Sequence, residues 1–114
     1  MNLRINTEKR DTHYFIALDG ELDVYTASKF QDTLEPIKAE GTHDIKLDLS
    51  QLSYMDSTGL GIFVGTLKAL DKNDKELYVI GASERIERLF DITGLKDLMN
   101  ITEGDEAWVH NMIM

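Results

Sequence analysis

The chain has 114 residues, of which 42% are hydrophobic and none is cysteine, so it is expected to form one domain without disulfides or thiolate sites. A net charge of −9 argues against direct binding to nucleic acid and favours protein partners, in particular partners with basic surfaces. No stretch approaches the roughly 20 apolar residues of a membrane span, and the N-terminus lacks the apolar run of a signal peptide, so we expect a cytoplasmic protein with no membrane contact.

Two strand patterns open the chain. Residues 3–7 alternate between apolar and polar types, and residues 13–18 are rich in strand-favouring types. Together they indicate an antiparallel pair. The Asp-Gly-Glu sequence at residues 19–21 is typical of a turn.

The next pattern has the period of a helix. It begins near Thr26, which is a possible N-cap, and Gly41 closes it. Pro36 predicts a kink or an early end, because proline removes one helical donor. The expected buried face consists of Ala27, Phe30, Leu34 and Ile37.

A strand over residues 44–49 comes next, followed by the most apolar helix of the chain, over residues 57–70. Leu60, Phe63, Val64, Leu67 and Leu70 recur along this helix at helical spacing. Gly61 and Gly65 share one of its faces, and we expect them to let the helix lie close against the sheet.

The C-terminal third repeats the alternation of strand and helix. Residues 76–80 form a short strand pattern, Ser83 is placed to cap the next helix, and Gly94 is placed to end it. A last short strand is expected over residues 98–101. Residues 102–105 have the spacing of a capping box, which predicts a final amphipathic helix over the tail, residues 103–114.

This order of elements predicts an α/β fold in one domain, residues 1–114. We expect a four- to five-stranded, mostly parallel sheet with an antiparallel N-terminal strand, flanked by about four helices. Functional loops of such sheets gather at the carboxyl ends of the strands. Residues 23–25, 56–57 and 81–83 are therefore expected to share one edge.

The junction at residues 54–61 joins a strand pattern to a helix pattern through Asp56 and two hydroxyls, Ser57 and Thr58. A helix N-terminus favours negative charge, so this is a natural place for a phosphate. The simpler interpretation is that Asp56 or Ser57 only caps the helix. A serine esterase needs glycine where Met55 stands, and the sequence contains no phosphate loop and no clustered metal ligands. We therefore expect no catalytic residues, no cofactor and no metal.

Three segments together carry a family resemblance: Gly-Glu-Leu-Asp-Val-Tyr at residues 20–25, Tyr-Met-Asp-Ser-Thr-Gly-Leu-Gly at residues 54–61, and Arg-Leu-Phe-Asp-Ile-Thr-Gly-Leu at residues 88–95. They resemble the bacterial anti-sigma factor antagonists, single-domain proteins of the STAS fold, and particularly the RsbV type that governs the general stress sigma factor. The resemblance implies a regulatory protein and not an enzyme. In its unphosphorylated form such a protein binds an anti-sigma factor and thereby releases the sigma factor.

The resemblance also implies that Ser57 is phosphorylated by that partner, an anti-sigma factor serine kinase of the RsbW type, and dephosphorylated by a PP2C-type serine phosphatase. Thr58 is the nearest alternative acceptor. The other expected partner-binding residues are Asp23, Tyr25, Asp56, Thr58, Gly59, Gly61, Ser83 and Arg85.

Some alternatives stay open from the sequence. Arg85 fits a solvated helix flank as well as a partner surface, and Asp23 with Tyr25 fits a structural turn. As a different function, the same helix N-terminus could serve a sensor that binds a small nucleotide. The tail carries no matching motif, so no function is assigned to it.

Overall fold

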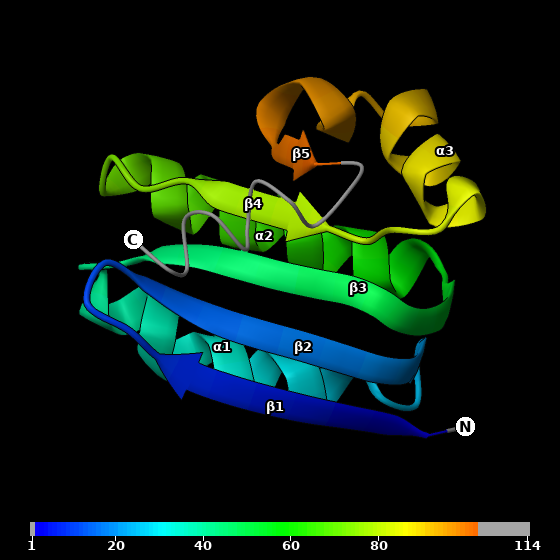
Figure 1. Cartoon of the computed structure of the whole chain (residues 1–114), viewed down its shortest axis with the longest axis horizontal. Helices are drawn as coiled ribbons and strands as arrows, with labels where there is room; N and C mark the ends of the chain where they lie inside the picture. The colour runs from blue at the N-terminus through cyan, green and yellow to red at the C-terminus, as the bar shows by residue number, and fades with distance from the viewer. Residues whose placement is uncertain (1, 103–114) are drawn as a thin grey trace.

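The computed structural model of the chain describes residues 2–102. A five-stranded sheet in the order β1-β2-β3-β4-β5 forms its centre (Figure 1). β1 is antiparallel to β2, and the remaining neighbours are parallel. The elements are β1 (Leu3–Lys9), β2 (His13–Leu22), α1 (Ala27–Glu40), β3 (Asp44–Met55), α2 (Ser57–Lys72), β4 (Leu77–Ile80), α3 (Glu84–Ile92), the 3-10 helix η1 (Leu95–Leu98) and β5 (Asn100–Thr102). The predicted α/β architecture is confirmed.

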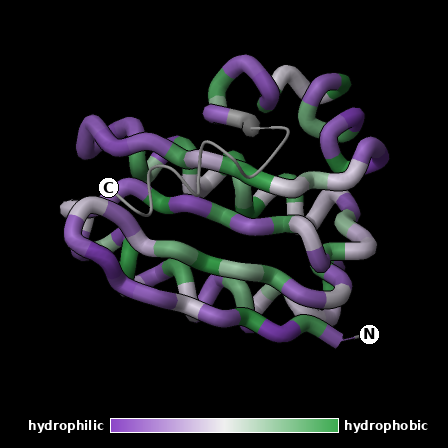
Figure 2. The backbone as a smooth tube through the Cα atoms, viewed as in Figure 1, coloured by the Kyte–Doolittle hydropathy of each residue, from purple (hydrophilic) through white to green (hydrophobic). Residues whose placement is uncertain are grey.

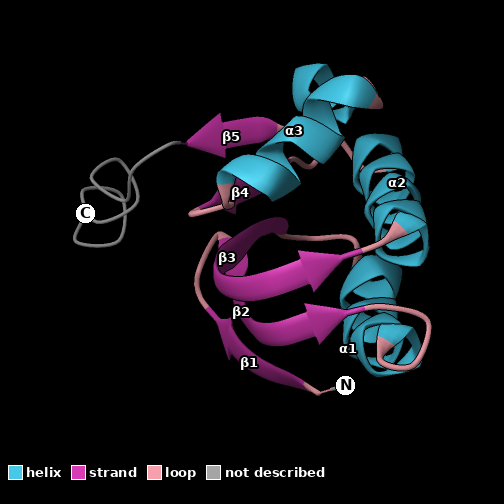
Figure 3. Ribbon diagram, turned by 90° about the vertical axis from the view of Figure 1, so that its right-hand side faces the viewer, coloured by secondary structure: helices cyan, strands magenta, loops and turns pink. Residues whose placement is uncertain are grey.

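The helices α1 and α2 lie side by side along one face of the sheet, and α3 adjoins α2 (Figure 3). One phenylalanine ring from each helix packs in a row between the three helices. The centroid of the Phe63 ring of α2 lies 6.1 Å from that of Phe30 of α1 and 5.3 Å from that of Phe90 of α3. All three rings are buried.

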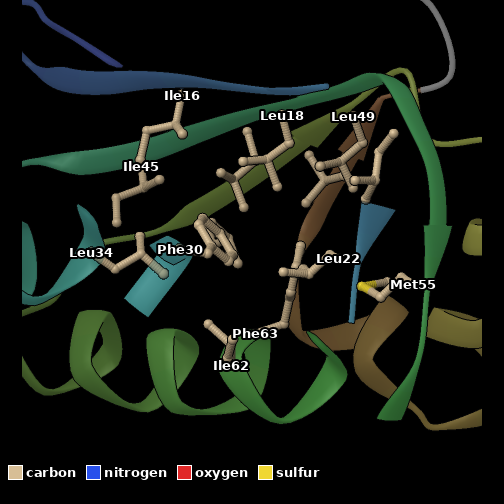
Figure 4. Close-up of a cluster of buried hydrophobic side chains, with 14 of the residues drawn as sticks. Ile16, Leu18, Leu22, Phe30, Leu34, Ile45, Leu49, Met55, Ile62 and Phe63 are labelled. Atoms are coloured by element: carbon tan, nitrogen blue, oxygen red, sulfur yellow. The ribbon is translucent and has the colours of Figure 1, made fainter. Parts of the chain in front are cut away.

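The sheet contributes alternate residues to the same core, which gives β2 and β3 their alternation in hydropathy (Figure 2). Figure 4 shows these strand side chains pointing toward the helices, among them Ile16, Leu18, Ile45 and Leu49. Fully burying one such side chain stabilises the fold by about 1.5–3 kcal/mol. This core holds the sheet in place, and the sheet in turn positions the loops that follow the carboxyl ends of β2 and β3.

The turn predicted at residues 19–21 is wrong. These residues lie inside β2, which continues to Leu22, and its register against β3 shifts between Ala17 and Asp19 and again between Gly20 and Glu21. Gly20 has a φ of +120°, and a Cβ there would overlap the carbonyl oxygen of Asn2. Bulges use the same residue types as turns, which explains the misassignment.

The helix α1 departs from expectation at its start and near its end. Its N-cap residue, Thr26, makes no capping hydrogen bond with its side chain. The helix continues through Pro36 to Glu40, so an early end at the proline is wrong, and Gly41 ends the helix with a φ of 66°. Both Pro36 and Asp32, whose carbonyl loses its helical donor, are exposed, so water can satisfy that carbonyl.

The prediction that Gly61 and Gly65 let α2 pack closely on the sheet is wrong. A Cβ added at either position would meet nothing within 4 Å. The glycine that allows close packing is Gly59, where a Cβ would lie 2.7 Å from Cγ of Met55 and 3.0 Å from Cδ2 of Leu22.

The end of the described chain also differs in detail. The last strand is Asn100–Thr102, and Leu95–Leu98 forms a 3-10 helix. The fourth helix expected over residues 103–114 lies outside the described residues. In residues 2–102 no helix combines the length and apolarity needed to cross a membrane.

Candidate functional site

The site forms where β2 and β3 end side by side. Leu22 is paired with Met55 at the last register position of these parallel strands, and the N–H of Asp56 donates to the carbonyl of Leu22 (3.3 Å). Parallel pairing therefore places the loop after β2 next to the start of α2. The expectation that residues 23–25 and 56–57 share an edge is confirmed by this geometry.

Asp56 is the N-cap of α2. Its Oδ1 accepts hydrogen bonds from the backbone N–H groups of Thr58 (2.9 Å) and Gly59 (3.2 Å), and its carbonyl accepts from the N–H of Leu60 (3.1 Å). These bonds satisfy donors that the first helical turn would otherwise leave unpaired. The capping interpretation thus applies to Asp56 and not to Ser57.

Ser57 is the first residue of α2, and it is exposed. In the described part of the chain its hydroxyl takes part in no hydrogen bond. Thr58 is exposed as well. A hydroxyl in this position is accessible to an enzyme that transfers a group onto it, since no bond within residues 2–102 has to be broken first.

The loop after β2 is held by a buried carboxylate. Asp23 is 4% exposed, and its Oδ1 accepts from the N–H groups of Tyr25 (2.9 Å) and Thr26 (3.1 Å). The Thr26 hydroxyl donates to the carbonyl of Glu21 (2.8 Å), which closes the loop. Oδ2 of Asp23 is buried, and it has no hydrogen-bond partner among the described residues.

A cavity of about 240 Å³ opens between the two loops. It combines three carboxylates with exposed apolar and aromatic groups; its lining residues are Glu21, Asp23, Val24, Tyr25, Tyr54 and Asp56. Tyr25 is 77% exposed and Val24 is 64% exposed. Exposed aromatic rings beside acidic groups are typical of a surface that binds another protein, and the acids favour a basic group from that protein.

Sequence reasoning missed Glu21, Val24 and Tyr54 as members of this site. Tyr54 precedes the buried Met55 in a strand, so alternation alone could have placed its ring on the opposite side from the core. The position of Glu21 depends on the bulges in β2, and no sequence signal reveals those.

Gly59 and Gly61 have different places in the site. Gly59 is buried under the first turn of α2, so it supports the site without facing a partner, whereas Gly61 is exposed.

Ser83 and Arg85 follow β4 and do not line the cavity. Ser83 accepts a hydrogen bond from the N–H of Ile86 (3.3 Å) and caps α3, as its position predicted. Arg85 is exposed on the first turn of α3. In Figure 1 the chain leaves β4 toward the same end of the sheet at which β3 turns into α2. Both residues therefore belong to this edge of the molecule but not to the cavity itself.

Among residues 2–102 there is no group of three or more histidine or acidic side chains arranged to hold a metal ion. The groups that the site does present are carboxylates, exposed aromatic rings and the accessible hydroxyl of Ser57.

Comparison with known proteins points to one group. Residues 4–106 match the STAS domain. The chain is 60% identical to an anti-sigma-B factor antagonist of Staphylococcus epidermidis over 107 residues, which cover 94% of this chain and 99% of that protein.

Solved structures agree on the fold. The anti-sigma factor antagonist SpoIIAA in its unphosphorylated form matches with a TM-score of 0.78 and 19% identity, covering 96% of this chain and 97% of that one. The phosphorylated form of SpoIIAA from Bacillus matches with a TM-score of 0.75 and 23% identity, covering 94% and 98%.

Proposed function

Since the chain belongs to the STAS domain family and, within it, to the anti-sigma factor antagonists, we propose that it binds its anti-sigma factor through the surface around Ser57 and loses this binding when Ser57 is phosphorylated. The partner is an anti-sigma factor that is also a serine kinase of the RsbW type. A serine phosphatase of the PP2C type reverses the modification. The chain itself is a substrate and a binding protein and performs no catalysis.

The observation that carries this proposal is the position of Ser57. Its hydroxyl is exposed at the first position of α2, beside Asp56 and next to the acidic and aromatic cavity. The kinase would supply ATP, metal and base, so the antagonist has only to present the hydroxyl.

Electrostatics explains how a phosphate would end binding. A phosphoserine adds about −1.5 to −2 charges. A partner that fits the carboxylates of Glu21, Asp23 and Asp56 has a limited number of basic groups, and the phosphate both adds charge and occupies space at the contact. Two like unit charges about 5 Å apart at an effective dielectric near 20 repel by roughly 3 kcal/mol, which corresponds to more than a hundredfold in affinity.

The same phosphate need not unfold the antagonist. It would sit at the N-terminus of α2, where the helix dipole favours negative charge. SpoIIAA in its phosphorylated and unphosphorylated forms matches this chain with similar TM-scores, 0.75 and 0.78. This similarity supports a switch that acts on the contact surface and leaves the fold in place.

A small-nucleotide sensor is not favoured by the site. The N–H groups of Thr58 and Gly59, which a nucleotide phosphate would need, already donate to Asp56. The neighbouring cavity is lined by three carboxylates, which repel phosphate groups. We propose that the protein acts in the cytoplasm, where sigma factors and their regulators meet.

The experiment that tests this function combines the protein with its anti-sigma factor and ATP, and locates phosphate by mass spectrometry. We expect one phosphate on Ser57, none in Ser57→Ala, and normal modification in Thr58→Ala. Phosphate on Thr58 in the wild-type protein, or none on either residue, would contradict the proposal.

A further inference from the structure

The helices of residues 2–102 pack on one side of the sheet, the side to which Ile16, Ile45 and Leu49 point (Figure 3, Figure 4). Neighbours along a strand point to opposite sides, whereas paired residues of adjacent strands point to the same side. Two rows of paired residues therefore cross the other side of β2, β3 and β4, and we call them the open face. The rows are Phe15, Lys46 and Tyr78, and beside them Ala17, Asp48 and Ile80.

The open face carries apolar and aromatic groups. Phe15 and Tyr78 present half-buried rings on the two sides of Lys46, and Nζ of Lys46 lies 5.4 Å from the centroid of the Tyr78 ring. Ile80 is 5% exposed, but it does not belong to the buried cluster between the sheet and the helices. Apolar groups gathered outside the main core are typical of a surface that another segment or molecule covers.

Positive charge marks the same face, although the net charge of the chain is −9. Besides Lys46, the turn after β1 contributes Arg10, whose Cζ lies 5.3 Å from the centroid of the Phe15 ring. Nη2 of Arg10 donates to Glu8 (3.0 Å), whereas Nε is buried and has no hydrogen-bond partner in the part of the chain that the structure describes. The open face therefore fits an occupant that combines apolar side chains with acids.

The chain itself contains a segment of this kind. Residues 103–114 directly follow β5, whose last residue, Thr102, is paired with Ile80. The acids of the segment are Glu103, Asp105 and Glu106. Its apolar residues recur at helical spacing: Trp108, Val109, Met112 and Ile113. β5 and β2 are three strand spacings apart, about 14 Å, and a helix of ten residues is about 15 Å long, so the segment can reach Phe15.

We propose that residues 103–114 dock on the open face, with their apolar side chains on Phe15, Tyr78 and Ile80 and their acids directed toward Lys46 and Arg10. The segment is joined to β5, so its docking is intramolecular and is favoured over a second copy of the chain. The protein thereby covers both faces of its sheet with its own residues. This inference is independent of the proposed function, because it does not involve Ser57.

The test uses the fluorescence of the full-length protein, since Trp108 is the one tryptophan of the chain. We expect its emission to lie at a shorter wavelength, and acrylamide to quench it less, than after unfolding in urea. Phe15→Ala and Lys46→Glu should each shift the emission toward that of the unfolded chain and increase the quenching. Lys68→Glu makes the same change of charge at an exposed position of α2, and this control should alter neither quantity.

Two further measurements make the result decisive. Circular dichroism checks that each variant is folded at the temperature of the measurement, and light scattering gives the number of chains per particle. Three results would overturn the proposal. Trp108 of the folded wild type is as accessible to acrylamide as in the unfolded chain; or it is protected, but neither Phe15→Ala nor Lys46→Glu changes its fluorescence; or the wild type is a dimer that Lys46→Glu dissociates, so that a second copy occupies the open face.

Discussion

At the scale of single residues, Asp56 and Ser57 have different surroundings at the junction between β3 and α2. The Asp56 carboxylate is committed to two backbone N–H groups, whereas in the described chain the neighbouring hydroxyl is exposed and makes no hydrogen bond. The acid therefore fixes the start of the helix, whereas the serine presents the hydroxyl that we propose is phosphorylated. The sequence could predict both residues from their motif, but it could not tell which of them caps the helix.

We expect Asp56→Ala to lower the free energy of unfolding by about 1 kcal/mol, because two N–H groups of α2 lose their acceptor. Asp56→Asn retains an acceptor oxygen and should cost clearly less. Urea unfolding at neutral pH measures both. Equal stability of Asp56→Ala and the wild type would show that the cap contributes nothing.

Tyr25 is an exposed residue on the surface that we propose binds the partner. Because 77% of it is exposed, we expect Tyr25→Ala to change the free energy of unfolding by no more than about 0.5 kcal/mol. Its affinity for the anti-sigma factor should fall about tenfold, as for an aromatic residue at the centre of an interface. Calorimetry checks this, with Gln31→Ala as the control. An unchanged affinity would remove Tyr25 from the surface.

At the scale of elements, the start of α2 depends on one close contact. Gly59 brings the first turn of the helix against Met55 of β3 and Leu22 of β2. The order of strands and helices was predictable from hydrophobic periodicity. The buried face of α2 could not be predicted from this periodicity, because Leu60, Val64 and Leu67 make the helix apolar on more than one side. The predicted packing of Gly61 and Gly65 failed for that reason.

The contact at Gly59 predicts that substitution by alanine changes the free energy of unfolding in opposite ways at Gly59 and at Gly61. Gly59→Ala should lower the free energy of unfolding by about 1–3 kcal/mol, since its Cβ would lie 2.7 Å from Cγ of Met55. Gly61→Ala, with nothing within 4 Å, should leave the stability equal or raise it. Urea unfolding of the two variants distinguishes them. If both lose stability alike, the assigned packing of α2 is wrong.

At the scale of the whole molecule, the cavity beside Ser57 lies at the carboxyl ends of β2 and β3, at one edge of the sheet. Asp23 and Tyr25 could be expected near Ser57 from parallel strand order alone. The cavity could not be predicted, because it needs the register between β2 and β3 and the bulges that position Glu21. His13 lies at the opposite end of β2 from this cavity, where it is paired with Asp44 at the first register position with β3.

His13 makes the stability of the molecule depend on pH. Burial, followed by the positive charges of Lys46 and Arg10, lowers the pKa of His13 below its usual 6.5. Near and below pH 6.5 the unfolded chain therefore binds more protons at this residue than the folded one, so its contribution to stability decreases as the pH falls from about 6.5 toward the folded pKa.

His13→Gln should remove this part of the pH dependence. Urea unfolding between about pH 8 and pH 5 should show a nearly constant difference between variant and wild type above pH 7, and a change in favour of the variant below about pH 6.5. A difference that stays constant over the whole range would contradict the assigned burial of the neutral imidazole.

The central claim is that one phosphate on Ser57 ends the contact with the anti-sigma factor. Its most direct test is the dissociation constant of the anti-sigma factor for the protein phosphorylated on Ser57, compared with the unmodified protein, by calorimetry in the same buffer. We expect the phosphorylated protein to bind about a hundredfold more weakly, with the affinity restored after a phosphatase removes the phosphate. Equal dissociation constants for the two forms would contradict the account.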